Sequence, residues 1–290
     1  MHPYLEIFAK LLNRPADSYK YQFGHVLVLG GSPGMVGAPL LSGLAALRTG
    51  AGLVTVAAAA EVTDKLERRV KELMTLSLPA EPAAAAAEIQ RFVRDRKVSV
   101  MVVGPGLAVT PGTRALLEQL LGTLELPLII DGGGLGALQT EWLPKAAPPA
   151  VILTPHTGEF QRLLPTALPS QRAALKPIAA QFAQANHVTL VLKGQPTYVA
   201  HSDGPVHENT TGNPGLATAG TGDVLSGTIA GLIAQHVEPP QAAEAAVYLH
   251  GLAGDLAADA KTEPGMIASD VIEAIPAAFQ RIASDISPGK

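Results

Sequence analysis

Asn209-Thr-Thr-Gly-Asn-Pro-Gly-Leu-Ala-Thr-Ala-Gly-Thr-Gly-Asp223 runs directly into the apolar, helix-like segment Val224–Gln235. Glycines in such a stretch let backbone amides approach a ligand without interference from a Cβ atom. The N-terminus of a helix adds unpaired N–H groups and the positive end of a dipole, so the stretch predicts a phosphate site. The glycines on which this prediction rests are Gly212, Gly215, Gly220, Gly222 and Gly227.

Asp223 places a negative charge where an anion is expected to bind. That arrangement is chemically sensible if Asp223 orients or deprotonates a hydroxyl group that attacks the phosphate. The alternative is that Asp223 only stabilises the start of a helix, because Asp is favoured in first turns. In either role, the helix dipole predicts a low pKa for this carboxyl group. The stretch by itself leaves both roles open.

Composition excludes several classes of protein. Of the 290 residues, 47% are hydrophobic and only 16% are charged, which is typical of a globular chain with a large core. The net charge of −4 gives no electrostatic reason to expect nucleic acid or an anionic membrane as a partner. The absence of cysteine excludes disulfides, thiolate metal sites and a cysteine nucleophile. Without a signal-peptide layout or a bilayer-spanning apolar run, we expect a cytoplasmic protein.

Short apolar runs alternate with longer segments of helical spacing, which predicts a mostly parallel sheet with helices on both faces. We therefore expect residues 1–290 to form a single α/β domain. Near the C-terminus the pattern becomes helical, and Thr197–Val206, with Ser202-Asp-Gly204 in its middle, predicts a hairpin at the sheet edge. The predicted strands are Val26–Leu29, Leu53–Ala57, Val98–Val103, Pro127–Ile130, Val151–Leu153 and Val188–Leu192. The predicted helices are Pro39–Thr49, Val62–Leu73, Ala84–Arg96, Pro111–Leu121, Val224–Gln235, Pro240–Ala260 and Ala268–Ile282.

In open α/β sheets, ligands bind at the carboxyl ends of the strands. The segments directly after the predicted strands are rich in glycine or carry a polar group. We therefore expect them to meet on one rim and to form the functional site. They are Gly30–Gly34, Gly104–Gly106, Asp131–Gly134, Thr154–Glu159 and Lys193–Thr197.

Together these segments resemble the NAD(P)H-hydrate dehydratase family, within the ribokinase-like superfamily. Members repair hydrated NADH and NADPH. The Gly220–Asp223 element alone is typical of the whole superfamily, and Thr154-Pro-His156 and Asn209–Gly215 make the resemblance specific. The resemblance extends over roughly residues 20–280 and implies a ribokinase-like three-layer sandwich. Its other carrying segments are His25–Ser32, Met35–Ala38, Arg48–Val54, Gly104–Gly106, Leu153–Phe160, Lys193–Gly194 with Thr197, and Tyr248–Asp255.

The resemblance also implies roles for individual residues. Asp223 is the implied catalytic residue, placed between the adenine nucleotide and the hydrated substrate. The implied substrate contacts are Ala38, Gly106, His156 and Asp223. The implied nucleotide contacts are Lys193, Gly194, Gln195, Pro196, Thr197, Gly220, Thr221 and Gly222. Glu159 is either a first-turn acid favoured by the helix dipole or a carboxylate that acts on Mg²⁺ through water.

The implied activity is that of a hydro-lyase. ADP, or alternatively ATP, phosphorylates the ring hydroxyl of the (S)-hydrate of NADH or NADPH with Mg²⁺ present, and phosphate is then eliminated to regenerate NAD(P)H, AMP and phosphate. Bacterial members use ADP, and we expect the same donor here. The resemblance further implies a homo-oligomer, specifically a tetramer. It also implies cooperation with a separate epimerase, because the fused N-terminal epimerase domain of many relatives is absent from this sequence.

The turn that begins at Asp131 departs from the family pattern. Relatives usually have Asp-Ala-Asp-Ala-Leu-Asn, whereas this chain has Asp131-Gly-Gly-Gly-Leu-Gly136. The second acid is replaced by Gly133 and the asparagine by Gly136, so any contact made by those side chains is absent. Glycine also carries a larger ordering cost, which predicts a more flexible loop. A smaller departure is Thr157, where the family usually has proline.

Simpler interpretations remain open at several positions. His156 is also compatible with a structural histidine, and Lys193 with a surface lysine. Asp131 ends a buried strand, where an acid needs a partner or a function. His250 and Asp255 are five residues apart on a predicted helix, which indicates packing or an oligomer contact. The histidines show no metal-ligand spacing, so we expect no zinc site.

Two other functions compete with the dehydratase. One is a small-molecule kinase of the same superfamily, of the hydroxymethylpyrimidine, pyridoxal or hydroxyethylthiazole type. The other is a non-catalytic homologue that binds adenylates, which would be expected to have lost Asp223 or Lys193. Both residues are present.

Overall fold

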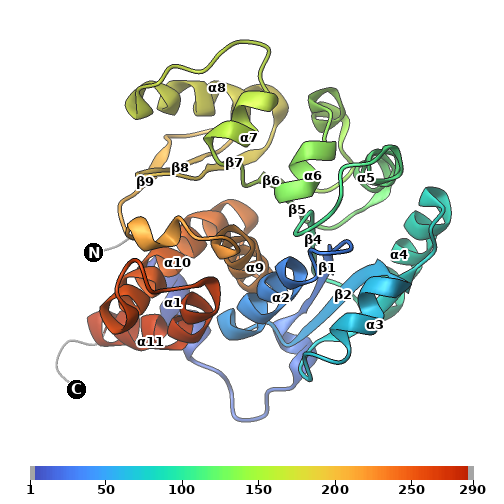
Figure 1. Ribbon diagram of the computed structural model, residues 1–290. Helices are drawn as coiled ribbons and strands as arrows, with labels where there is room; N and C mark the ends of the chain where they lie inside the picture. The colour runs from blue at the N-terminus through green and yellow to red at the C-terminus, as the bar shows by residue number, and fades with distance from the viewer. Residues whose placement is uncertain (1–3, 287–290) are drawn as a thin grey trace.

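A single sheet organises residues 4–286, which are the residues that the computed structural model describes (Figure 1). Within them the strand order is β3-β2-β1-β4-β5-β6-β7-β8-β9. Neighbours from β3 to β7 pair in parallel, and β8 and β9 add antiparallel strands at one edge. The strands are β1 (His25–Leu29), β2 (Leu53–Ala59), β3 (Met74–Leu78), β4 (Val100–Val103), β5 (Leu128–Ile130), β6 (Val151–Leu153), β7 (Thr189–Leu192), β8 (Thr197–Ala200) and β9 (His207–Asn209).

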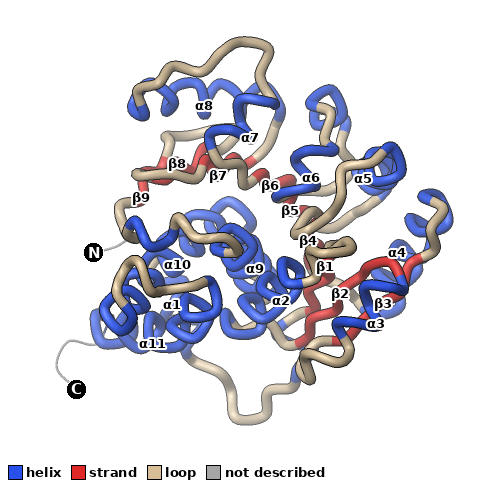
Figure 2. Tube along the Cα trace, in the orientation of Figure 1, coloured by secondary structure: helices blue, strands red, loops and turns tan. Residues whose placement is uncertain are grey.

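Helices cover both faces of the sheet, as Figure 2 shows. One apolar core joins the sheet to α1 (Leu5–Leu12), α2 (Gly37–Thr49), α3 (Ala60–Leu66), α9 (Thr221–Ala234), α10 (Pro239–Lys261) and α11 (Ala268–Ile286). The core on the other face joins it to α4 (Pro82–Arg96), α5 (Pro111–Thr123), α6 (Gly132–Ala137), α7 (Thr157–Arg162) and α8 (Leu175–Asn186). Four short 3₁₀ turns among the described residues are Lys20–Phe23, Thr140–Lys145, Arg172–Ala174 and Pro214–Leu216.

The central strands are buried on both sides, which explains why their sequences lack a simple alternation. In β1, Val26 and Val28 belong to one core and Leu27 and Leu29 to the other. Every residue of the strand is therefore apolar apart from His25. The predicted mostly parallel α/β sandwich is confirmed, and the six predicted strands all form within two residues of their expected bounds.

The edge of the sheet at β3 was not predicted. The expected helix Val62–Leu73 was wrong in its C-terminal half, because α3 ends at Leu66 and the chain turns before entering β3. Strand β3 pairs with β2 on one side only, and its residues are exposed or half-buried. An edge strand with one partner lacks the continuous apolar run by which the inner strands were recognised.

The predicted hairpin at the other edge is confirmed. Thr197–Asn209 contains β8, a turn through Ser202–Gly204, and β9, which begins one residue beyond the expected end. The predicted start of α5 is also confirmed, because the hydroxyl of Thr110 accepts a hydrogen bond of 3.0 Å from the amide of Thr113. None of the helices within residues 4–286 is both long enough and apolar enough to cross a bilayer.

Helices α2 and α9 pack with their backbones in close approach. A Cβ atom on Gly227 would lie 2.0 Å from the carbonyl oxygen of Ser42, and one on Gly231 would lie 2.8 Å from that of Ala46. The hydroxyls of Ser42 and Ser226 lie 3.3 Å apart in the same buried contact. The assignment of Gly227 to the ligand-binding glycines was therefore wrong, since it makes room for a neighbouring helix.

Replacing Gly227 by alanine should destabilise the fold by about 1–3 kcal/mol, because the added methyl group forces α9 away from α2. Gly122→Ala is the matched control. Gly122 is exposed in α5 with no atom within 4 Å of an added Cβ, so this change should raise stability by about 0.5–1 kcal/mol. Urea unfolding of both variants measures the difference, and equal effects would contradict the proposed packing.

Candidate active site

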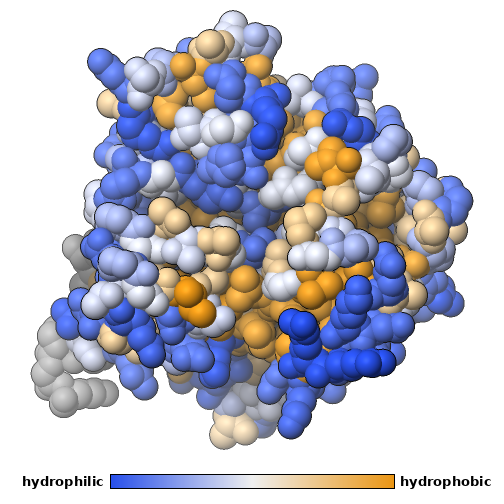
Figure 3. All heavy atoms as spheres, viewed as in Figure 1, coloured by the Kyte–Doolittle hydropathy of each residue, from blue (hydrophilic) through white to orange (hydrophobic). Residues whose placement is uncertain are grey.

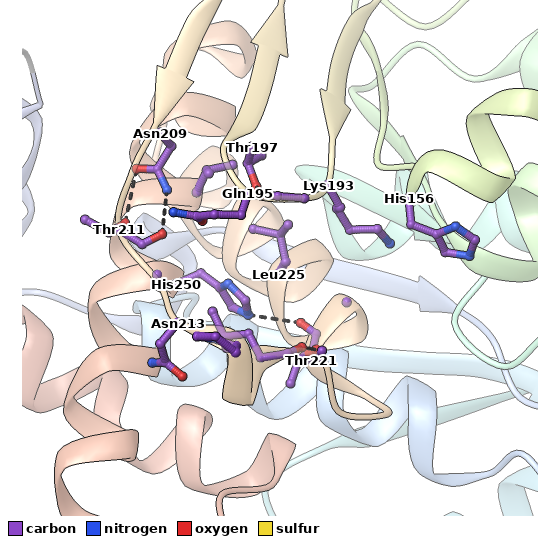
Figure 4. A pocket seen from close by; sticks show the side chains of 18 residues that line it. His156, Lys193, Gln195, Thr197, Asn209, Thr211, Asn213, Thr221, Leu225 and His250 are labelled. Carbon is purple, nitrogen blue, oxygen red and sulfur yellow. Dashed lines mark hydrogen bonds between the residues drawn. The ribbon is translucent and has the colours of Figure 1, made fainter. Parts of the chain in front are cut away.

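The carboxyl ends of β6 and β7, the N-terminus of α9 and the Asn209–Leu216 segment enclose a cavity of about 570 Å³ (Figure 4). Its polar lining includes side chains from distant parts of the sequence, and Figure 4 shows them converging from the sheet and from α10. The site predicted at the strand ends therefore has a cavity beside it. The predicted residues that line it are His156, Lys193, Gly194, Gln195, Thr197, Thr221 and Gly222.

Asp223 lies in the first turn of α9, where the N-cap is Gly220. The predicted low pKa of its carboxyl group is wrong. Burial raises the pKa to about 7, and the charges of Asp131 and Glu159 raise it further, while Lys193 opposes the change. Desolvation thus outweighs the favourable helix dipole. A carboxyl group that titrates near neutrality is suited to accept a proton.

Lys193 is the cation at the centre of these carboxylates. Its Nζ atom donates a hydrogen bond of 3.1 Å to Oδ1 of Asp131 and lies 3.8 Å from Oε2 of Glu159. Burial alone would lower the pKa of Lys193, but the charges of Asp131, Glu159 and Asp223 outweigh it and raise the pKa. Lys193 is therefore not a free surface lysine, and Asp131 has the partner that its burial required.

His156 has a structural function that leaves one ring nitrogen available. It is the N-cap of α7, and its Nδ1 atom accepts hydrogen bonds of 3.0 and 3.2 Å from the amides of Gly158 and Glu159. An accepting Nδ1 atom puts the proton of the neutral ring on Nε2. The ring lines the cavity, and its side chain is 58% exposed. The structural and ligand-binding interpretations are thus compatible with each other.

Glu159 completes the same capping box. Its Oε2 atom accepts a hydrogen bond of 2.9 Å from the amide of His156. This is the first-turn role, and the side chain is nearly buried beside Lys193. Among residues 4–286, no group of three or more Asp, Glu or His side chains is arranged to hold a metal ion by itself. A direct protein cage for Mg²⁺ is therefore not present in the described part of the chain.

His250 fixes the phosphate-binding turn predicted at Gly220–Gly222. The Nε2 atom of His250 donates a hydrogen bond of 3.0 Å to the carbonyl oxygen of Thr221, as Figure 4 shows. Burial lowers the pKa of His250 to about 4, so the ring is neutral near pH 7. Gly220 has a φ of +94°, which a residue with a side chain adopts only with strain, and it turns the chain into α9.

Two further side chains fix the loops around the cavity. Arg172 donates hydrogen bonds of 2.7 Å to the carbonyl oxygens of Leu192 and Pro196, and so fixes the loop from Lys193 to Thr197. The carboxylate of Asp255 accepts hydrogen bonds of 3.0 Å from the amide of Gly212 and from the side chain of Asn213. Both residues support the walls of the cavity from outside.

Sequence reasoning missed these supporting functions. His250 and Asp255 were predicted to serve packing or an oligomer contact, and the loops that they hold were not foreseen. Arg172 lies in a segment without a recognisable pattern, and no motif indicated it. Gly215 also serves packing, because an added Cβ atom would lie 2.5 Å from the sulfur of Met266.

Ala38 and Gly106 lie beside each other on the adjoining part of the rim. A Cβ atom on Gly106, whose φ is +67°, would lie 3.1 Å from Cβ of Ala38 and 2.5 Å from the carbonyl oxygen of Met35. These residues come from α2 and from the segment after β4, so they do not line the cavity at β6 and β7. The structure therefore separates the predicted nucleotide contacts from part of the predicted substrate contacts.

The glycine-rich turn at Asp131 forms the short helix α6. A Cβ atom on Gly133 would lie 2.1 Å from the carbonyl oxygen of Leu107, and one on Gly136 would lie 2.7 Å from Cγ2 of Val109. The segment after β4 thus packs directly onto the turn. At Gly133 the absence of a side chain is a steric requirement of this packing, because the obstacle is backbone, whereas at Gly136 the obstacle is one methyl group of the exposed Val109.

The geometry and the sequence agree with one family. A family model described as NAD(P)H-hydrate dehydratase matches residues 26–277. The chain belongs to this family. A crystal structure of the ADP/ATP-dependent NAD(P)H-hydrate dehydratase from Bacillus subtilis, co-crystallized with ATP and Mg²⁺, is similar with a TM-score of 0.83. The two chains are 31% identical, and the similarity covers 95% of this chain and 96% of that one. The predicted ribokinase-like fold and family resemblance are confirmed.

Relatives of the family differ in length. The chain is 40% identical over 285 residues to the bifunctional NAD(P)H-hydrate repair enzyme of Moorella thermoacetica, covering 96% of this chain and 53% of that enzyme. It therefore spans about half the length of such bifunctional relatives. The ADP-dependent (S)-NAD(P)H-hydrate dehydratase of Bacillus subtilis is 34% identical over 273 residues, covering 94% of this chain and 95% of that protein.

Asp223→Asn should stabilise the fold at alkaline pH. Folding raises the pKa of Asp223 from its ordinary 3.8 to about 7, so its contribution to stability is lost as pH rises through this window. The melting temperature of the variant should exceed that of the wild type at about pH 8, and the gain should shrink toward about pH 4. Asp64→Asn, at an exposed position, is the control. A gain independent of pH would contradict the raised pKa.

Proposed function

We propose that this protein is a hydro-lyase that uses ADP to dehydrate the (S)-hydrates of NADH and NADPH, producing NAD(P)H, AMP and phosphate. The observation that supports this most strongly is Asp223, a carboxyl group with a pKa near neutrality at the N-terminus of α9, beside Lys193 and a nucleotide-sized cavity. The family match and the names of the relatives support the same reaction.

The reaction begins at the ring hydroxyl of the hydrate. Its oxygen attacks the terminal phosphorus of ADP, its proton passes to Asp223, and the bond to AMP breaks. The ring nitrogen then expels inorganic phosphate from the phosphorylated carbon, and loss of a proton from the neighbouring ring carbon restores the dihydronicotinamide. Phosphorylation is needed first because hydroxide is a poor leaving group.

The surroundings of Asp223 stabilise the charge that develops on the phosphoryl group. Amide groups of Gly220–Gly222 at the start of α9 can donate to its oxygens, and the ammonium group of Lys193 lies beside Gly222. The Lys193–Thr197 loop and the Asn209–Asn213 segment would hold the adenosine part in the cavity. Ala38, Gly106 and His156 would contact the hydrate on the other side of Asp223.

Magnesium fits this site only through phosphate oxygens and water. One oxygen of Asp131 is paired with Lys193, and one oxygen of Glu159 accepts the amide of His156. Each carboxylate keeps one oxygen that can accept from a metal-bound water. When bound, Mg²⁺ would neutralise charge on the phosphates of the donor.

The ADP/ATP-dependent enzyme from Bacillus subtilis was co-crystallized with ATP and Mg²⁺, and a relative from the same organism is named for its dependence on ADP. These names favour an adenine nucleotide with Mg²⁺, and we propose ADP as the donor. We also propose that the protein acts in the cytoplasm as a homo-oligomer, with a tetramer as the specific form, and that it cooperates with a separate epimerase. The kinase and adenylate-binding alternatives are less well supported, since the family match extends over residues 26–277.

A direct test incubates the purified protein with Mg²⁺ and hydrated NADH, with ADP or ATP in parallel. Reduced-nicotinamide absorbance should return with ADP, and Asp223→Asn should lower kcat by at least about a hundredfold. The variant should still bind ADP, because the substitution removes a charge and Asp223 does not form part of the cavity wall. No recovery of absorbance with either nucleotide would reject the dehydratase.

The pH dependence of kcat/KM should report the environment of Asp223. A base with a pKa of about 7 must lose its proton to act, so the rate should fall as pH decreases through this value. Asp131→Asn removes a charge that repels Asp223, and it also removes the ion-pair partner that competes with Asp223 for Lys193. Both effects lower the pKa, so the acid limb should move to lower pH. A shift in the opposite direction would contradict the assigned coupling.

A further inference from the structure

A second cavity, of about 240 Å³, lies on the same rim of the sheet at the ends of β1, β2, β3 and β4. Helices α3, α4 and α5 contribute to its walls. Figure 3 shows hydrophobic surface in the hollow between α4, α5 and the loop after β1. This cavity plays no part in the chemistry assigned to Asp223.

The lining of this second cavity is neutral. None of the described residues that line it is Lys, Arg, His, Asp or Glu. Its hydroxyl groups belong to Ser32, Thr110 and Thr113, and these already have partners: Ser32 donates to the carbonyl oxygen of Gly106, and Thr113 donates to that of Ala108. Such a lining suits an uncharged, largely apolar group and offers no cation for a phosphate.

The size of the cavity limits what can occupy it. Sites that enclose a drug-sized ligand measure about 300–1,000 Å³. A cavity of about 240 Å³ therefore suits one ring system and excludes a whole dinucleotide. A nucleobase that enters the cavity while its phosphates remain outside would fit both the volume of the cavity and its uncharged lining.

The wall of the second cavity touches the residues of the proposed hydrate site. The hydroxyl of Ser32, in its wall, lies 2.9 Å from the carbonyl oxygen of Gly106, and Gly106 lies against Ala38. Leu107 and Ala108 follow in sequence and also line the cavity. A single short segment after β4 thus faces the hydrate site at one residue and the second cavity at the next two.

The proposed reaction leaves one half of the hydrate without a binding site. The cavity between β6, β7 and α9 takes the phosphoryl donor, and the nicotinamide end must reach Asp223. The adenosine half of the hydrated dinucleotide must then extend away from the donor along the rim. In that direction the sheet order runs from β5 to β4, β1 and β2, where the second cavity lies.

We propose that the second cavity binds the adenine base of the hydrated dinucleotide, an inference that rests on the proposed dehydratase activity. Binding energy from this remote end would then position the ring hydroxyl at Asp223. The glycine turn at Gly133 and Gly136 contributes indirectly, because it lets the segment from Leu107 to Thr110 lie where it forms one wall.

The test compares two substrates in the presence of ADP and Mg²⁺: hydrated NADH, and the hydrate of reduced nicotinamide mononucleotide, which lacks the adenosine half. For the wild type, kcat/KM should be at least about tenfold higher for the dinucleotide hydrate. Ala59→Trp fills the cavity from the end of β2 at an exposed position. It should remove most of that advantage and leave the mononucleotide hydrate unaffected.

Ala60→Trp is the matched control, since Ala60 is the next residue, is exposed and does not line the cavity. It should preserve the advantage of the dinucleotide. Ala80→Trp, from the loop after β3, repeats the filling from another wall if Ala59→Trp folds poorly. The adenine site alone would be overturned if wild-type kcat/KM were equal for the two hydrates. It would also be overturned if Ala59→Trp and Ala80→Trp lowered kcat/KM equally for both hydrates. No turnover of either hydrate by the wild type would instead reject the dehydratase, and the adenine site with it.

Discussion

The close contact between α2 and α9 is the constraint on which the site depends. Gly227 lets α9 approach the carbonyl oxygen of Ser42, and this fixes the distance of α9 from α2. Because the contact lies less than two turns from the start of the helix, it also fixes where the N-terminus of α9 points. Gly220, Gly222 and Asp223 thereby face the carboxyl ends of the strands. Packing and chemistry are consequences of the same helix position.

At the N-terminus of α9, several carboxylates lie around a single cation. Three carboxylates, Asp131, Glu159 and Asp223, share one ammonium group, Lys193. Lys193 is hydrogen-bonded to Asp131, so Asp223 is left with burial and repulsion, which raise its pKa. A carboxylate that is unfavourable in the folded protein is the one best able to take a proton near pH 7. The surroundings of Asp223 therefore lower folding stability near neutral pH, and the same surroundings make its carboxylate a better proton acceptor.

Much of the fold was predictable from the sequence, because the strands at the centre of a parallel sheet are buried on both faces and leave continuous apolar runs. The edge strand β3 was not, since one exposed side removes that signal and the preceding helical pattern was extended across it. Asp223, Lys193 and His156 were predicted because glycines and strand ends are typical of a ligand site, and the structure places them on one rim. Their supports were not: Arg172, His250 and Asp255 act through backbone carbonyl and amide groups of loops whose positions only the folded chain reveals. The pKa of Asp223 was misjudged for the same reason, since burial and neighbouring charges are properties of the assembled site.

The glycine turn shows how a departure from a family pattern can be misread. From the sequence, Gly133 and Gly136 are lost side chains in a loop with a larger ordering cost. In the structure they are contact points, where the backbone of Leu107 and the side chain of Val109 occupy the space that a Cβ atom would need. The segment after β4, which begins with Gly104–Gly106, lies in the space that side chains at these two positions would occupy. A substitution in one loop is therefore matched by the position of its neighbour, so restoring an acid at Gly133 would displace Leu107 before it could add any contact to the substrate.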